Sequence, residues 1–463
     1  MECSSIVFIV VDALRKDYAK PLEDALVNLG FVKYERAIAP APWTLPSHAS
    51  MLTGLYPILH GAHETKNKKI PEIKLKKKTS LLTIELQELG FKTYLLSANP
   101  YVSPNFGFIG FGSFYEIPVC PDFSLLSNEE TIFIGKLLRK NNRSRIGVAK
   151  RLILTGQYKL FLKSALHFLL RRIYRLIYHP IYRWPIHKSS KRIIKEFKKV
   201  MSRNSDERKF ILINFMEVHQ PYFMRDIFDE EKRNNWKTNE KPDLKLVRKW
   251  REHYSREIEY IVQRVLDLIK VLEETNEFEK SLIIVTSDHG QLLGEHGRLG
   301  HGVFLYDELL RVPLLIKYPK DAEIKIMSKK SEYVSLVKLK QLILKVAKNE
   351  LKDDGVLYSE TVFSECYGIQ GKIDELKTEE EKKNIGILDK YRIAIYHGDF
   401  KGIFNVENWR FEEILSYNPD RKVTEEVAEE LKRKVLKFLK NSLSLKILKS
   451  QEAEKPLKPL GKR

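Results

Sequence analysis

The chain has 463 residues, of which 43% are hydrophobic, and it carries a formal net charge of +20. This length and apolar content suffice for a large core, which excludes a chain that is disordered as a whole and favours one large domain with an appendage or two ordinary domains. Three widely spaced cysteines, Cys3, Cys120 and Cys366, support neither a disulfide framework nor a thiolate zinc site, so we expect a reducing compartment, the cytoplasm.

The first apolar run, Ile6 to Val11, ends at Asp12 and is too short for the core of a signal peptide, so it predicts a first β-strand. The most apolar stretch elsewhere, Tyr158 to Tyr182, contains three arginines. It therefore lacks the roughly 20 uncharged apolar residues of a membrane-spanning helix. We expect a protein that is soluble or peripheral to a membrane.

Five apolar, β-branched runs predict buried strands: Ser5–Val11, Phe91–Leu96, Phe210–Met216, Leu282–Thr286 and Val312–Ile316. Helical patterns lie between them, at Leu81–Leu89, Ser190–Met201 and Glu257–Glu274. This alternation predicts an α/β fold with a mostly parallel central sheet flanked by helices, over residues 1–320. Beyond it, Lys-rich helical stretches and strand-like pieces predict a small C-terminal α+β subdomain over residues 321–448, and residues 449–463 predict a flexible tail.

One segment, Lys136 to Arg203, carries about twenty Lys and Arg residues against a single acid, Glu196, and accounts for nearly the whole net charge. We predict a basic helical insertion over about residues 136–187. Peripheral contact with an anionic membrane through residues 155–186 is one interpretation, and a lid helix whose arginines face water is the other. No nucleic-acid-binding motif accompanies this charge, so we expect no nucleic-acid partner.

Polar residues follow four of the predicted strands at the point where each strand ends. Asp12 follows the first, Asn99 the second, His219 the third, and Asp288 with His289 the fourth. Ligands of open α/β sheets bind beyond the carboxyl ends of the strands. A single site formed by these residues is the simplest interpretation.

Residues Ala41 to Gly54 predict a loop that turns into a helix, with Pro46 near the first helical position. Thr44 would then lie at the helix N-terminus, where free amides attract an anionic ester and bring its central atom near the Thr44 hydroxyl. The alternative for Thr44 alone is a helix cap.

Asp12, Asp288 and His289 combine carboxylate oxygens with an imidazole, a ligand set suited to Zn or Mn. A divalent cation at this position would lower the pKa of the Thr44 hydroxyl and make it a nucleophile. For the Asp-His-Gly sequence at residues 288–290 alone, a tight turn with a solvated histidine is the alternative.

Two further histidines have open roles. His219 and His301 could each protonate the departing oxygen of an ester or form part of a second metal position. For His296, between Glu295 and Gly297, loop architecture is the favoured interpretation.

The ordered series of motifs resembles the sulfatase branch of the alkaline-phosphatase-like superfamily, over roughly residues 4 to 320. The resemblance is carried by Val11–Asp17, Thr44–His48 with Leu52–Pro57, Phe108–Tyr115, His219–Tyr222, Asp288–Gly290 and His301–Pro313. It implies metal coordination by Asp12, Thr44, Asp288 and His289, nucleophilic attack by Thr44, and substrate or leaving-group contact by His219 and His301.

The departures from this family concern the nucleophile and its neighbours. Family sulfatases convert a cysteine or serine into formylglycine, and threonine cannot be converted to that aldehyde. His48 replaces the motif's arginine, Ala13 the second of two aspartates, and Ala98 and Pro100 a lysine and a histidine. The chain therefore resembles the threonine-using relatives, namely nucleotide phosphodiesterases, phosphonate hydrolases and lipid phosphoethanolamine transferases, which form a phosphothreonine.

We accordingly expect a metal-dependent hydrolase or transferase of phosphate mono- or diesters, with one tightly held divalent ion, Zn or Mn before Ca, and with Asn99 in contact with the substrate. The expected partner is a small, lipid-linked or glycan-linked anionic ester. Two alternatives are a sulfuric ester hydrolase that uses unmodified threonine and a catalytically silent protein that binds anionic glycans or lipids.

Overall fold

The structure is a computed structural model in which the chain forms two compact units, residues 1–117 with 189–463, and residues 118–188. The described residues of the first unit are 3–76, 79–117, 189–203, 207–220, 222, 241–371 and 378–454. Those of the second unit are 125–127, 130, 133–134, 137–138 and 144–178. Residues 179–187 of the predicted insertion and 455–463 of the predicted tail lie outside them.

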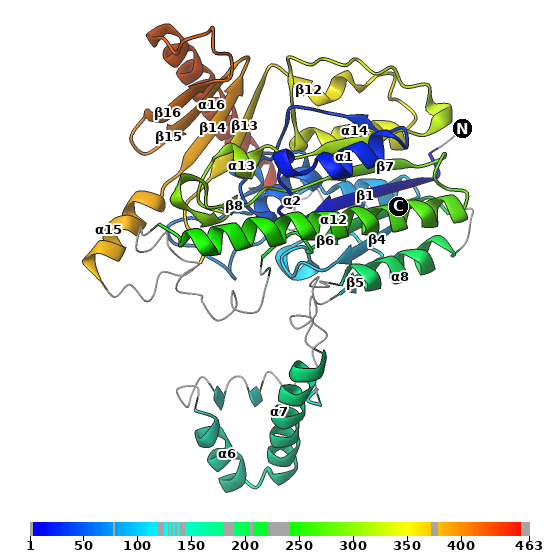
Figure 1. Cartoon of the computed structure of the whole chain (residues 1–463), viewed down its shortest axis with the longest axis vertical. Helices are drawn as coiled ribbons and strands as arrows, with labels where there is room; N and C mark the ends of the chain where they lie inside the picture. Colours follow the sequence, from blue (N-terminus) through cyan, green and yellow to red (C-terminus); the bar gives the residue numbers. More distant parts are fainter. Residues whose placement is uncertain are drawn as a thin grey trace. The chain divides into compact units, whose positions relative to one another are not determined.

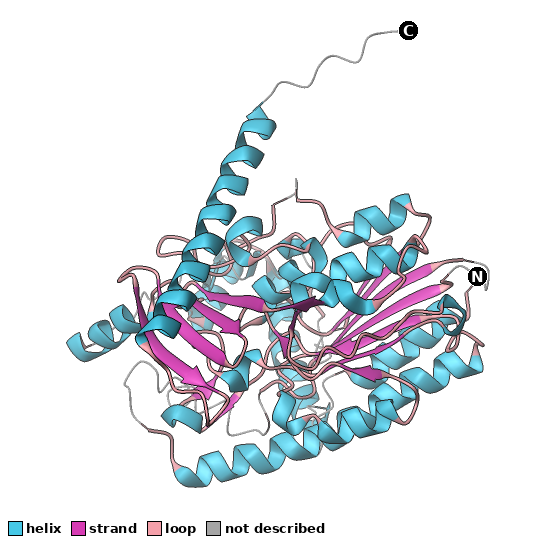
Figure 2. Cartoon of the chain, turned by 90° about the horizontal axis from the view of Figure 1, so that it is seen from above, coloured by secondary structure: helices cyan, strands magenta, loops and turns pink. Residues whose placement is uncertain are grey.

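The first unit is organised around a seven-stranded sheet (Figures 1 and 2). In spatial order its strands are β2 (Val32–Lys33), β10 (Leu314–Lys317), β7 (Leu282–Thr286), β1 (Ser5–Val11), β6 (Lys209–Phe215), β4 (Lys92–Ser97) and β5 (Ser113–Glu116). The five strands from β7 to β5 run parallel, and β10 is antiparallel to both of its neighbours. The predicted mostly parallel α/β sheet is therefore confirmed. Two predicted strands match β1 and β7 at both ends, and the other three differ from β4, β6 and β10 by one or two residues at their ends.

Helices cover both faces of this sheet, as the alternation of side chains along β1 requires. Ile6, Phe8 and Val10 belong to one core cluster with residues of three helices, α2 (Thr44–Thr53), α4 (Leu82–Glu88) and α14 (Leu339–Ala347). The other face is covered by α1 (Lys20–Val27), α8 (Ser190–Met201) and α12 (Leu244–Glu274), and α12 contacts both of the others. Because α14 shares the core of the sheet, packing with the sheet domain continues beyond the predicted boundary at residue 320.

The remaining sheets of this unit are smaller. A four-stranded antiparallel sheet has the order β13 (Thr361–Cys366), β14 (Arg392–His397), β15 (Phe400–Asn405) and β16 (Arg410–Ser416). A three-stranded sheet consists of β12 (Tyr358–Ser359), β11 (Tyr333–Ser335) and β3 (Ala37–Ile38), and a two-stranded one of β8 (Leu292–Leu293) and β9 (Leu299–Gly300).

Short helices connect these elements: α3 (Pro57–His60), α13 (Asp307–Leu310) and α15 (Glu379–Leu388), with 3-10 turns at Lys16–Tyr18, Pro104–Phe106, Glu295–Gly297, Lys320–Ala322, Leu336–Lys338 and Asp354–Leu357. The last helix, α16 (Glu425–Glu454), packs on the four-stranded sheet through Leu431, Val435 and Leu439 and extends past it (Figure 2). Residues 449–454, which we expected in a flexible tail, are helical because no helix-breaking residue precedes Pro456.

The described residues of the second unit include the helices α6 (Arg145–Leu154) and α7 (Tyr158–Tyr178), joined by a short turn. They pack on a small core of Leu137, Val148 and Leu152. No helix in the described part of the chain combines the length and the apolarity that crossing a bilayer requires.

Candidate active site

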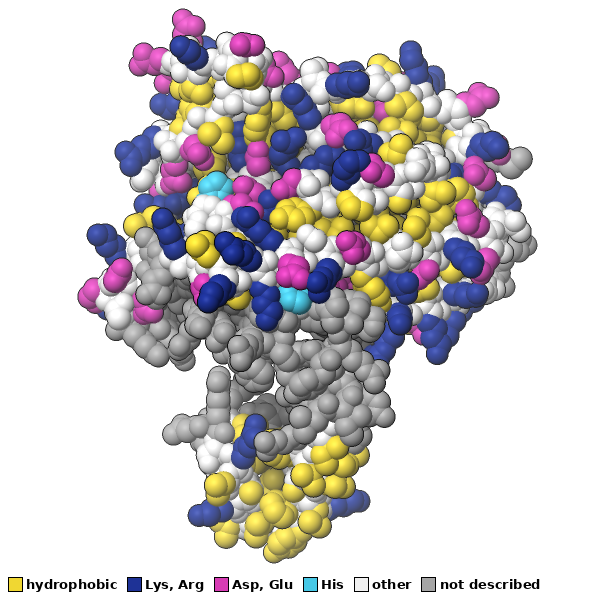
Figure 3. Space-filling view, in the orientation of Figure 1, with side chains coloured by type: hydrophobic (Ala, Val, Ile, Leu, Met, Phe, Trp, Pro, Cys, Tyr) yellow, Lys and Arg dark blue, Asp and Glu magenta, His cyan; other side chains and the backbone are white. Residues whose placement is uncertain are grey.

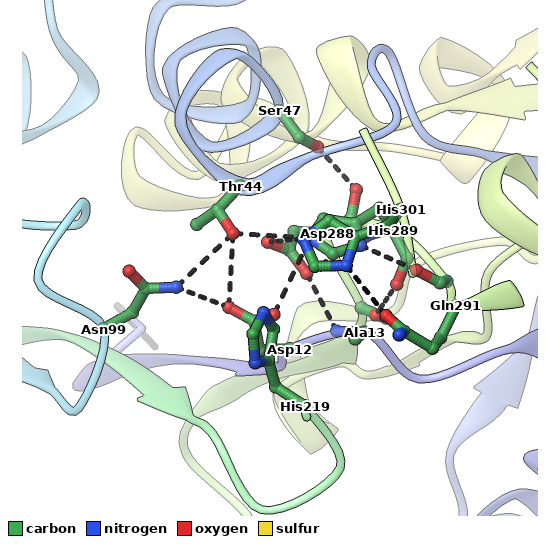
Figure 4. A network of polar contacts seen from close by, with 12 residues as sticks. Asp12, Ala13, Thr44, Ser47, Asn99, His219, Asp288, His289, Gln291 and His301 are labelled. Carbon is green, nitrogen blue, oxygen red and sulfur yellow. Dashed lines mark hydrogen bonds and ion pairs between the residues drawn. The ribbon is translucent and has the colours of Figure 1, made fainter. Parts of the chain in front are cut away.

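The candidate site lies at the carboxyl end of the parallel strands. Asp12 directly follows β1, Asn99 follows β4, and Asp288 with His289 follows β7. Because these strands are parallel and close together in the sheet, their ends bring the side chains to one edge. Figure 4 shows the cluster, to which Thr44 is added from α2.

Thr44 is the first residue of α2 rather than its cap, since the cap position is held by Trp43, whose side chain makes no capping bond. Its hydroxyl instead lies 3.4 Å from Oδ2 of Asp12 and 3.3 Å from Nε2 of His289. Ser47, one turn later, donates a 2.7 Å hydrogen bond to the backbone oxygen of Asp288. The start of α2 is thus fixed against the segment that follows β7.

Two carboxylate oxygens of the cluster are buried without a hydrogen-bond partner, Oδ1 of Asp12 and Oδ2 of Asp288. Ligand atoms of Asp12, Asp288 and His289 all lie within 4.8 Å of one another. Nδ1 of His289 lies 2.8 Å from the Gly290 carbonyl oxygen, to which it donates, so Nε2 carries the lone pair. Unpaired buried anionic oxygens are costly unless a cation compensates them, so these residues fit a divalent metal ion.

The two carboxylates titrate differently. Burial, reinforced by the charge of Asp288, raises the pKa of Asp12. Burial also acts to raise the pKa of Asp288, but His289, His48 and the Ala13 amide outweigh it and lower this pKa to about 2. Asp288 is therefore the permanent anion of the pair, and a cation would favour the charged form of Asp12 as well.

The loop that carries Asp12 is held from two sides. Ala13 adopts a φ of +62°, and its amide donates to Oδ1 of Asp288 over 3.3 Å. The buried hydroxyl of Tyr254, on α12, donates to the Ala13 carbonyl oxygen over 2.7 Å and accepts from the Arg15 amide over 2.9 Å. On the other side, the Leu14 amide donates to Oγ of Ser287. These contacts stabilise a left-handed residue next to a proposed ligand.

Gly290 has a steric reason to be glycine. Its amide donates to the Leu309 carbonyl oxygen over 2.8 Å, and a Cβ at this position would overlap the carbonyl oxygen of Glu308. The Asp-His-Gly sequence therefore forms a close backbone contact as well as supplying two polar side chains.

Asn99, predicted to contact the substrate, is engaged within the cluster. Its amide nitrogen donates to Oδ2 of Asp12 over 2.7 Å and reaches Oγ1 of Thr44 at 3.4 Å. It is 4% exposed, so its amide orients the carboxylate and the hydroxyl from one side.

His219 and His301 are adjacent to the cluster. The His301 ring stacks on His289, with centroids 4.5 Å apart, and meets the His219 ring edge at 5.0 Å. Nδ1 of His301 donates to Gln291 over 2.8 Å, which leaves Nε2 as the acceptor. Burial, followed by the charges of His289 and His219, holds the pKa of His301 well below its usual value.

His296 is separate from these rings. It stacks on Tyr306 at the surface, and its Nε2 lies 3.3 Å from Glu308. These contacts agree with its interpretation as a loop residue.

Sequence reasoning did not assign a role to His48. This buried side chain lies one turn after Thr44, with Nδ1 3.1 Å from the Thr44 carbonyl oxygen and 3.4 Å from Oδ2 of Asp288, while Nε2 faces Asn214 of β6 at 3.3 Å. The i, i+4 spacing from Thr44 was the available signal, because residues so spaced share one helix face. Asn214 and Tyr254 carry no comparable local signal.

Known proteins resemble the chain in sequence and in fold. A family model described as Sulfatase matches residues 4–349. Among curated proteins, an N-acetylglucosamine-6-O-sulfatase from Bacteroides thetaiotaomicron is 45% identical over 53 residues, which are 11% of this chain and 9% of that protein. A choline-sulfatase from Rhizobium meliloti is 38% identical over 73 residues, 16% of this chain and 14% of that protein. The matched segments thus span only a small part of these relatives.

Solved structures extend the similarity to nearly the whole chain. A phosphonate monoester hydrolase from Silicibacter pomeroyi has a TM-score of 0.59 and 16% identity, covering 95% of both chains. A 2-O GAG sulfatase has a TM-score of 0.59 and 14% identity, covering 99% of this chain and 94% of its own. At these identities the likeness concerns the fold.

Proposed function

Because the chain belongs to the sulfatase family, we propose that it is a metal-dependent ester hydrolase, and that Thr44 attacks phosphate mono- or diesters as the nucleophile. The observation that carries this proposal is the convergence of the Thr44 hydroxyl with two buried, unpaired carboxylate oxygens. A capping or purely structural threonine would not explain why one buried oxygen of Asp12 and one of Asp288 lack a hydrogen bond.

The metal site consists of Asp12, Asp288, His289 and Thr44. A divalent cation, Zn or Mn for this mixed donor set, supplies positive charge that lowers the pKa of the hydroxyl and offsets charge on the ester oxygens. Oδ2 of Asp12 lies within 3.4 Å of the Thr44 oxygen and is the nearest carboxylate to accept its proton. Asn99 donates to this carboxylate and reaches the hydroxyl, so it orients the two groups toward each other.

The reaction proceeds in two displacements. Oγ1 of Thr44 attacks phosphorus, the bond to the leaving oxygen breaks, and a phosphothreonine forms; water, or an acceptor alcohol in the case of transfer, then breaks the phosphorus bond to Thr44. Nδ1 of His219 donates to the Gln220 carbonyl oxygen and Nδ1 of His301 donates to Gln291, so each ring has Nε2 left for the substrate. Either histidine, when protonated on both nitrogens, can protonate the leaving oxygen through Nε2, and the other then orients an ester or water hydrogen.

We propose phosphorus esters rather than sulfur esters as substrates because the nucleophile, Thr44, is a threonine. An unmodified alcohol lacks the geminal hydroxyls of a hydrated formylglycine, and Thr44 cannot be converted to that aldehyde. Sulfuric ester hydrolysis remains the second candidate, because two relatives matched by sequence are named as sulfatases. The substrate would be an anionic ester carried by a small molecule, a glycan or a lipid, and a membrane surface is a proposed partner.

The location of the enzyme is part of the proposal. Cys3 and Cys366 are buried free thiols, and burial raises their pKa values to about 11 and about 12, so both stay protonated. Unpaired thiols are typical of a reducing compartment, and we propose the cytoplasm.

A substrate panel tests the proposal. Aryl phosphate, aryl phosphodiester and aryl sulfate are assayed in parallel with Mn, Zn and Ca, and intact-protein mass spectrometry follows Thr44 during turnover. We expect turnover of a phosphorus ester, a phosphoryl adduct on Thr44, and a loss of at least a thousandfold in Thr44→Ala. Thr53→Ala, the same substitution at the other end of α2, is the matched control, because the Thr53 hydroxyl bonds local backbone groups: it donates to the Ala49 carbonyl oxygen and accepts from the Leu55 amide.

The other outcomes select the alternatives. Turnover of aryl sulfate alone would contradict the preference for phosphorus. A wild-type protein that binds the metal but turns over none of a broad ester panel would instead be a binding protein for anionic glycans or lipids.

A further inference from the structure

The helices α6 and α7 expose an unusual amount of apolar surface. Ten of the 21 exposed large hydrophobic side chains of the described chain lie within residues 133–173, although the second unit contributes only three buried ones, Leu137, Val148 and Leu152. Leu154, at the end of α6, is 86% exposed, and Ile146, at its start, is 72% exposed. Contiguous exposed apolar surface of this kind marks an interaction site.

On α7 the exposed apolar residues form a stripe. Tyr158, Leu162, Leu166, Leu169 and Ile173 follow one another at intervals of three or four residues, so they lie on one helix face. The opposite face, with Phe161 among its residues, packs toward α6. The stripe is therefore not covered by the packing of the two helices on each other.

The charge of the same segment has one sign. Residues 144–178 contain eight Lys and Arg and no Asp or Glu. Lys163 pairs with Glu130 at 2.6 Å, and the Arg145 guanidinium lies over the Phe168 ring at 4.2 Å. Figure 3 shows yellow apolar side chains gathered on this unit, with dark blue cationic ones beside them.

A cavity between α6 and α7 adds an apolar interior to this surface. Its volume is about 450 Å³, and its lining includes Leu138, Val148, Leu152 and Phe168. This volume lies within the range of ligand pockets. An apolar chain has room in it.

We propose that α6 and α7 dock on the surface of an anionic lipid bilayer, with the stripe and Leu154 at the boundary between headgroups and acyl chains. Lipid is favoured over a protein partner because apolar residues face outward from both helices, including Leu154 and Tyr158 on either side of the turn, and because a segment with no acid complements a negative surface. The helices lie on the membrane rather than crossing it, which agrees with their hydropathy. This inference does not depend on the chemistry of Thr44.

Vesicle flotation of the full chain tests the proposal. The wild type is mixed with vesicles of phosphatidylcholine alone or with one-third phosphatidylglycerol, and we expect binding that is at least tenfold stronger to the anionic vesicles and weakens as salt rises. The triple variant Leu154→Ser, Leu162→Ser, Leu169→Ser should lose at least tenfold of this binding. The matched control replaces Leu443, Leu445 and Ile447 of α16, which are exposed to similar extents, and should bind like the wild type.

Three results would overturn the proposal. The first is a wild type that floats with neither vesicle, and the second is a triple variant that binds vesicles as tightly as the control. The third is a wild type that binds no vesicle but is a dimer in light scattering, and that the triple substitution converts to a monomer. The last result would assign the stripe to a second copy of the chain. Since these assays measure no turnover, their failure is distinct from failure of the proposed reaction, and hydrogen exchange of residues 144–178 with and without vesicles checks that the variants remain folded.

Discussion

The hydroxyl of Tyr254 is expected to hold the Asp12 loop, and Tyr254→Phe removes that hydroxyl alone. In the wild type this hydroxyl bonds the Arg15 amide at 2.9 Å and the Ala13 carbonyl oxygen at 2.7 Å. The substitution leaves both groups without a partner in a buried region. Each unsatisfied buried polar group costs about 1–3 kcal/mol, so with two such groups the free energy of unfolding should fall by about 2–6 kcal/mol. Because Ala13 needs support at its positive φ, the adjacent carboxylate should also move.

Urea unfolding followed by circular dichroism measures the first effect, and kcat/KM on the best aryl ester, expected to fall at least tenfold, measures the second. Tyr260→Phe is the matched control on the same helix, because that hydroxyl approaches Ser190 Oγ at 3.3 Å in a partly buried place. Its cost should stay below about 1 kcal/mol. Equal destabilisation by the two substitutions would refute the reasoning.

Three further predictions concern the site and its surroundings. Gly290→Ala should lower kcat/KM at least tenfold, because its Cβ would overlap the Glu308 carbonyl oxygen, whereas Gly386→Ala, which meets no atom within 4 Å, should leave activity unchanged. Burial raises the pKa of Glu64 to about 7, so its stabilising, protonated form is fully present below about pH 4.5 and is lost as pH rises through 7. The unfolding free energy of the wild type minus that of Glu64→Gln should therefore fall by up to about 3 kcal/mol between pH 4.5 and 8, and a constant difference would contradict this. Adding Mn or Zn to chelator-treated protein should raise its melting temperature by a few degrees, and Asp288→Asn should abolish that shift, as calorimetry can measure.

Elements with a long local pattern were predictable from sequence, and short ones were not. β1, β6 and β7 are buried at every residue and appear in the sequence as continuous apolar runs. The two-residue strands β2 and β3 form only through pairing with distant segments, so they leave no periodic signal. The antiparallel direction of β10 likewise depends on how it pairs with β2 and β7, and its own residues do not indicate it.

One helix was predicted too short although its pattern was complete. α12 begins at Leu244, not at Glu257, and Val247, Trp250 and Tyr254 continue its buried face toward the N-terminus at spacings of three and four. The many Lys and Arg residues between them obscured this face. In the site, strand-end residues were predictable because strand ends converge, whereas Tyr254 reaches the site from the middle of a helix that only tertiary packing places there.

The departures from the family motif remove two cationic side chains and one carboxylate from the site. The resemblance to the family places an arginine where this chain has His48, and a lysine where it has Ala98, while one aspartate is replaced by Ala13. What remains is two buried carboxylates, which one divalent cation balances. Each buried charge that is not compensated is costly. A site without the two fixed cations therefore compensates the two charges of a phosphate monoester less well than the single charge of a monoanionic ester. Among the phosphorus esters proposed as substrates, this charge balance favours diesters, whose single negative charge the site can accept.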